Sequence, residues 1–152
     1  MNGGSGLNIL YVDILDAMHI PWSELHPVSS PFHGVIPGMQ AYPLGKIDQP
    51  IMFGNCTNFC SDVLTFDVVD FLGSYHAISG RSCYTKFMAI PNYTYLKLKM
   101  LGPNGIITVG STFSHAYTCD HKHYELATAI INSTKLPELR NSVTPTVPDR
   151  NR

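Results

Sequence analysis

Apolar and polar residues alternate along several short runs of the chain, and this pattern predicts a fold made mainly of β-strands. The clearest run is a hairpin predicted over residues 95–111, where Leu98 and Met100 alternate with polar residues before a Gly-Pro-Asn-Gly turn. A second hairpin is predicted around a Pro-Gly dipeptide at Pro37, which has β-prone residues on both sides. Many short strands of this kind are typical of a small barrel or sandwich.

Helical spacing is found only in short segments. Residues 7–20 predict a strand that passes into a short helix, because Ile14, Leu15 and Met18 recur at helical spacing before Pro21. The other expected elements are a strand over residues 46–53, a loop over 56–62, two strands within 63–78, and a short helix over 80–90 with Tyr84, Phe87 and Met88 on one side.

The end of the chain has a different pattern. From Tyr124 onward the residues have helical periodicity, and residues 142–152 then lose every core-forming pattern. We therefore expect one domain over residues 1–125, followed by a helical or disordered linker-like tail over residues 126–152.

Composition narrows the classes of function. The chain has 152 residues, enough for one domain with a modest core. Only 14% of the residues are charged, which is low for a soluble domain and indicates either a surface that a partner covers or poor solubility. The formal net charge is −1, and the basic residues are spread along the chain. This predicts no binding to nucleic acid or to an anionic membrane.

The sequence also predicts where the protein resides. No apolar run approaches the roughly 20 residues that span a bilayer, and the Gly-rich start lacks the basic and apolar regions of a signal peptide. We expect an intracellular protein of the cytoplasm or nucleus. In that setting the cysteines, Cys56, Cys60, Cys83 and Cys119, are expected to be reduced.

Several chemistry-bearing groups have a structural interpretation. His115, Cys119, His121 and His123 lie within nine residues, but their spacing matches no strong zinc pattern. A polar segment leaving the domain is favoured, with a metal site as the alternative, and no cofactor is expected. The remaining groups are expected to be solvated carboxylates (Asp13, Asp16, Asp67 and Asp70) and packing tyrosines (Tyr75, Tyr84, Tyr93 and Tyr95).

Three stretches together carry a family resemblance: NGGSGLNILY, GVIPGMQAYPLGKIDQPIMFG and YHAISGRSCYTKFMAIPNYTYLKLKMLGPNGIITVG. The chain resembles the retropepsin-like aspartic protease domain of plant gypsy-type LTR retrotransposon polyproteins, over roughly residues 2 to 125. The resemblance implies a small closed β-barrel with one or two short helices, and an active site that a homodimer shares.

The catalytic position of that family is altered in this chain. Each protomer of the family supplies one Asp in a turn, and two such carboxylates share a proton so that one acts as acid and the other as base. The matching residues here are Asn2, Gly3, Gly4 and Ser5. An amide cannot take a proton from water near neutral pH, so the resemblance implies an inactive homologue rather than an enzyme.

Two further departures are expected to weaken the site. The family places a strand before the catalytic turn, whereas this chain starts at Met1, and Ser79 replaces an apolar residue under the site. Asn2 is also followed by glycine, which leaves the backbone nitrogen unhindered, so deamidation can return a carboxylate to position 2.

The resemblance assigns a peptide groove to two segments. One is the flap formed by Val35, Ile36, Pro37, Gly38 and Met39, and the other contains Ile78, Gly80 and Arg81. We expect a retrotransposon-derived protein that acts by binding a protein or peptide, as a co-opted regulator in defence or genetic conflict. The alternatives are a residual aspartic protease that works as a homodimer and a translated pseudogene without selected function.

Overall fold

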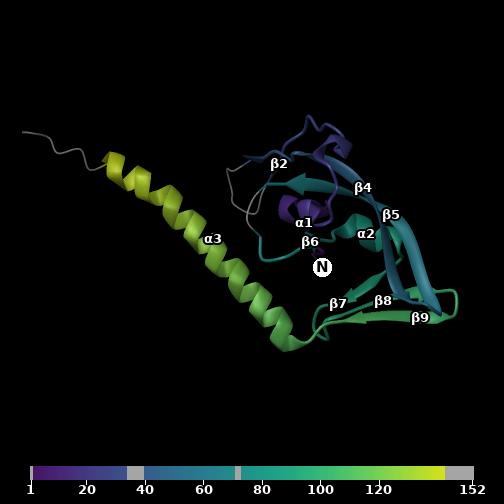
Figure 1. The fold of residues 1–152 in the computed structure, drawn as a ribbon. Helices are drawn as coiled ribbons and strands as arrows, with labels where there is room; N and C mark the ends of the chain where they lie inside the picture. The colour runs from purple at the N-terminus through teal and green to yellow at the C-terminus, as the bar shows by residue number, and fades with distance from the viewer. Residues whose placement is uncertain (1, 34–39, 71–72, 143–152) are drawn as a thin grey trace, which may run out of the picture.

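A computed structural model of the protein describes residues 2–33, 40–70 and 73–142, and this part of the chain is mainly β, as the sequence predicts (Figure 1). Its elements in chain order are β1 (Ile9–Tyr11), α1 (Val12–Ala17), the 3-10 turn η1 (Trp22–Glu24), β2 (Phe32–His33), β3 (Gln40–Ala41), β4 (Gly45–Asn55), β5 (Asn58–Val69), β6 (Ala77–Ile78), α2 (Arg81–Lys86), β7 (Ile90–Asn92), β8 (Lys97–Gly102), β9 (Gly105–Gly110) and α3 (Phe113–Ser142).

The strands form two sheets and one short ribbon. The larger sheet has the order β4-β5-β1-β6, the smaller sheet has the order β7-β8-β9, and β2 pairs with β3. Within the larger sheet β1 runs parallel to β5 and antiparallel to β6. Among the described residues no sheet closes on itself, so the strands shown here do not form a closed barrel.

The β4–β5 hairpin is the longest feature of the larger sheet and bends toward the smaller one (Figure 1). The side chain of Asn55 holds its turn, because Asn55 Oδ1 accepts hydrogen bonds from the backbone of Thr57 and Asn58. The tip then binds the β8–β9 turn, where Asn104 Nδ2 donates to the carbonyl of Thr57 at 2.7 Å. The loop predicted over residues 56–62 is therefore wrong, since pairing with β4 extends the strand back to Asn58.

The hydrophobic core lies between the two sheets and the two short helices. Leu15 of α1, Val68 of β5 and Cys83 of α2 are fully buried, and Leu98 and Met100 of β8 pack into the same cluster. The alternation predicted for β8 is confirmed, because Leu98 and Met100 are buried while Lys97 and Lys99, which alternate with them, are exposed.

Helix α2 departs from its prediction at one residue. Tyr84 and Phe87 are buried as expected, but Met88 has 72% of its surface exposed. The helix ends at Lys86, and Met88 adopts φ of 46°, so the chain turns away from the core before this side chain.

Helix α3 leaves the smaller sheet and runs along one side of the domain (Figure 1). It begins at Phe113, because Thr112 Oγ1 accepts a hydrogen bond from the backbone N–H of His115 and so caps the first turn. Residues 115–123, the polar segment that contains the histidine and cysteine cluster, are thus helical, and the helix passes through the predicted boundary at residue 125. None of the described helices combines the length and apolarity needed to cross a lipid bilayer.

Candidate functional site

Asn2 begins a tight turn in the Gly-rich segment. Its backbone carbonyl accepts a hydrogen bond from Ser5 N at 3.2 Å, and its side-chain Oδ1 accepts one from Gly4 N at 3.0 Å. The backbone N–H of Asn2 donates to the carbonyl of Ser79 at 3.0 Å. The Asn2 side chain is therefore exposed and oriented by the turn itself.

Ser5 fixes the other end of this turn. Its hydroxyl donates to the carbonyl of Leu7 at 2.8 Å and accepts from the N–H of the same residue. The carbonyl of Ser5 accepts a hydrogen bond from Arg81 N at 2.9 Å, which ties the turn to the first residue of α2. The Asn2–Ser5 turn is thus held at both ends by the segment that precedes α2.

Asn8 and Gly80 stabilise the segments that hold the turn. Asn8 is buried, and its side chain accepts from Gly80 N at 2.9 Å while donating to the carbonyl of Thr65 at 3.1 Å. Gly80 passes so close to the backbone that a Cβ there would lie 2.3 Å from the carbonyl oxygen of Leu7. One amide side chain therefore connects β5, the start of β1 and the start of α2.

Two tyrosines lie beside the turn. The Tyr93 hydroxyl packs against Gly3, where an added Cβ would lie 2.4 Å from it. Tyr84 is buried, and its hydroxyl has no hydrogen-bond partner of normal geometry among the described residues. Burial raises the pKa of Tyr84, and the neighbouring Tyr93 adds to this effect. The Tyr84 phenol therefore remains neutral near neutral pH and cannot supply a base to the Asn2 turn.

The structure brings most of the expected site residues together. Asn2, Gly3, Gly4 and Ser5 meet the segment that contains Ile78, Gly80 and Arg81, and Ile78 pairs with Ile9 of β1. The flap residues, Val35, Ile36, Pro37, Gly38 and Met39, lie outside the described residues.

An open cavity of about 700 Å³ adjoins the turn. Ser79, whose carbonyl binds Asn2, and Tyr93, whose hydroxyl covers Gly3, both belong to its wall. One side is the β8–β9 hairpin and the other is the first part of α3. Its apolar and aromatic lining consists of Phe53, Tyr75, Tyr93, Leu96, Leu98, Val109, Phe113, Ala116 and Tyr117.

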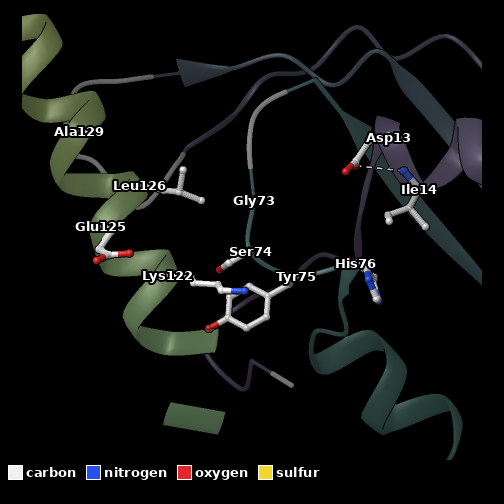
Figure 2. A pocket seen from close by; sticks show the side chains of 10 residues that line it. All are labelled: Asp13, Ile14, Gly73, Ser74, Tyr75, His76, Lys122, Glu125, Leu126 and Ala129. Atoms are coloured by element: carbon white, nitrogen blue, oxygen red, sulfur yellow. Dashed lines mark hydrogen bonds between the residues drawn. The ribbon is translucent and has the colours of Figure 1, made fainter. Parts of the chain in front are cut away.

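A second cavity, of about 670 Å³, lies further along α3 (Figure 2). Figure 2 shows Lys122 and Leu126 of α3 projecting toward the loop that carries Ser74 and Tyr75. Asp13 on the opposite side is hydrogen-bonded to the adjacent N–H of Ile14. The lining mixes both signs of charge with apolar groups and contains no paired carboxylates, so it offers no evident acid–base chemistry.

Asp67 is the one buried carboxylate among the described residues. It faces Lys46 across the β4–β5 ladder, with Nζ and Oδ1 3.8 Å apart. Burial raises the pKa of Asp67, and Lys46 opposes that change. The expectation that Asp67 is solvated is wrong, because Asp67 is buried on an inner strand of the sheet, with β4 on one side of β5 and β1 on the other. Asp70, the residue directly after β5, is exposed as expected.

The histidine and cysteine cluster lies on α3. Helical geometry places His115, Cys119 and His123 along one face of α3. His121 lies on another face, where its Nδ1 is 3.4 Å from Oε1 of Glu125. Over the described ranges, no three His, Cys, Asp or Glu side chains lie close enough to hold a metal ion. All four cysteines are free, as the sequence predicts.

Three residues of the site were not anticipated from sequence. Asn8 interrupts an apolar run at the start of β1, and such a polar residue is a visible signal of a buried hydrogen-bond network. Tyr93 and Phe113 carry no comparable signal, since their places beside the turn and in the cavity wall depend on how distant segments meet.

Comparisons of the chain with protein-family models, with curated proteins and with solved structures give no match. The retropepsin-like resemblance therefore rests on the residues quoted from this chain, and what it implies enters as a proposal.

Proposed function

We propose that this chain is a catalytically inactive, retropepsin-like protein of retrotransposon origin that acts by binding a protein or peptide partner. The observation that carries the proposal is the exposed Asn2 amide at the head of a well-anchored turn, next to an open apolar cavity. The turn keeps the hydrogen bonds that would position a catalytic carboxylate, but the group that would transfer a proton is absent from position 2.

The cavity beside the turn supplies the binding surface. Its volume of about 700 Å³ lies within the range of about 300–1,000 Å³ that is typical of ligand sites. Phe113 and Tyr117 form part of its wall, and 78% and 61% of their surfaces remain exposed. We infer that the occupant is a peptide segment with apolar or aromatic side chains, because such segments bury exposed aromatic residues most effectively.

The first test is binding of a peptide library to the immobilised full chain. We expect the selected peptides to be rich in apolar and aromatic residues. Phe113→Ser and Tyr117→Ser should each weaken the binding of a selected peptide by about tenfold, as loss of an aromatic anchor does. Fluorescence titration of the labelled peptide measures this change.

Tyr124→Ser is the matched control, because Tyr124 is an exposed aromatic residue of the same helix that lies outside the cavity wall. Equal losses in all three variants, or peptides that bind every variant as tightly as the unaltered chain, would contradict a binding site in this cavity.

The second test concerns catalysis. Freshly purified protein, with an intact Asn2 amide verified by mass spectrometry, should show no peptide cleavage at acidic or neutral pH. Asn2→Asp alone should not restore normal turnover, because Ser79 sets a polar residue beside the turn even where two altered chains pair their carboxylates. Asn132→Ala, a change on the exposed side of α3, serves as the purification control. Pepstatin-sensitive cleavage by the fresh chain would refute the proposal.

A further inference from the structure

The chain contains two Asn-Gly dipeptides, Asn2–Gly3 and Asn104–Gly105, and the structure holds them in different ways. Both asparagines are exposed, so access to water does not distinguish them. We propose that Asn2 is a site of spontaneous deamidation that the folded state selects over Asn104. This inference does not rest on the proposed function, since it concerns the chemistry of the turn alone.

The reaction needs only water as a co-reactant. The backbone nitrogen of Gly3 attacks Cγ of Asn2, the Cγ–Nδ2 bond breaks, and Nδ2 leaves as ammonia with the proton that Gly3 N gives up. The product is a five-membered succinimide. One water molecule then opens this ring at either carbonyl and leaves an aspartate or an isoaspartate at position 2. No oxidation or reduction takes place.

The Asn2 turn favours the first step. The Gly4 N–H donates to Asn2 Oδ1 at 3.0 Å, which polarises the carbonyl and stabilises the negative charge that develops on this oxygen during attack. The attacking group is free, because the N–H of Gly3 has no hydrogen-bond acceptor among the described residues. The leaving Nδ2 likewise has no acceptor in that part of the chain.

The Asn104 turn opposes the same step. Asn104 Nδ2, the leaving group, donates to the carbonyl of Thr57 at 2.7 Å, and the backbone N–H of Asn104 donates to Asn58 Oδ1 at 3.0 Å. Gly105, which carries the attacking nitrogen, is paired with Gly102 at the end of the β8–β9 ladder. Reaction at Asn104 therefore requires the two turns to separate first.

The test measures the deamidation rate of both asparagines in the unaltered full chain during incubation at mildly alkaline pH in water labelled with a heavy oxygen isotope. Peptide mapping by mass spectrometry quantifies the label incorporated at each position. In the native protein Asn2 should react at least about tenfold faster than Asn104, because reaction at Asn104 breaks two or more hydrogen bonds. In urea the two rates should become similar, since both asparagines precede glycine.

Similar rates in the native protein would overturn the proposal. An unchanged ratio in urea would also overturn it, because the preference would then come from local sequence rather than from the fold. Asn58→Ala removes one acceptor of Asn104 and should raise the Asn104 rate alone, whereas Asn132→Ala should change neither rate. Because the native and urea comparison uses the unaltered chain, the test does not depend on the folding of any variant.

Discussion

Replacement of Asn8 with alanine is expected to lower the free energy of unfolding by about 2–4 kcal/mol. The side chain is buried and bonds two backbone groups from distant segments, Gly80 N at 2.9 Å and the carbonyl of Thr65 at 3.1 Å. Alanine leaves the buried Gly80 N–H without an acceptor and opens a small void. Urea denaturation of the variant beside the unaltered chain measures the loss.

The Asn8 prediction also has a local component. Amide exchange at Gly80 and Arg81 should accelerate more than exchange in the β8–β9 hairpin, because one of the lost bonds holds the N–H of Gly80, directly before α2. Asn132→Ala is the matched control, an asparagine on an exposed helix surface, and should change stability by less than about 0.5 kcal/mol. If Asn8→Ala and Asn132→Ala have the same free energy of unfolding, the buried Asn8 amide does not stabilise the site.

Gly80→Ala is expected to lower the free energy of unfolding by about 3 kcal/mol. The new Cβ would lie 2.3 Å from the carbonyl oxygen of Leu7 and 2.8 Å from that of Ser5. Both contacts are with backbone atoms, which cannot rotate away as a side chain does. Since φ of Gly80 is −95°, a conformation open to any residue, the whole cost is steric. Thermal and urea unfolding measure the loss.

Gly6→Ala tests this explanation within the same segment. A Cβ at Gly6 would meet only a guanidinium nitrogen of Arg81, at 3.6 Å, which is an ordinary contact. The Gly6→Ala variant should therefore have a free energy of unfolding close to that of the unaltered chain. If the Gly6 and Gly80 variants lose equal stability, the effect comes from reduced backbone freedom in the Gly-rich segment and not from the close approach at Gly80.

The Asn8→Ala and Gly80→Ala variants also bear on the candidate site. Both disturb the segment that holds the Asn2 turn and leave the cavity wall formed by Phe113 and Tyr117 unaltered. We expect them to change deamidation at Asn2 through the turn and to have smaller effects on peptide binding through the cavity. The same pair of variants thus separates the chemistry of the turn from recognition in the cavity.

The sequence by itself determined the local elements of this protein. Alternating apolar residues specify the β8–β9 hairpin, because successive side chains of a strand point to opposite faces and only one face here is buried. Helical spacing before Pro21 specifies α1, which ends at Ala17 with a left-handed residue at His19.

Only the tertiary structure decided which segments become neighbours. Burial of Asp67 follows from the parallel pairing of β1 with β5, two strands far apart in the chain, and no local pattern names a strand's partner. Likewise, the sequence predicts a loop over residues 56–62, yet pairing with β4 makes residues 58–62 part of a strand. The cavity wall needs the β8–β9 hairpin and α3 to lie side by side. Periodicity shows which face of an element is apolar, whereas the partner of that face depends on how all the elements pack together.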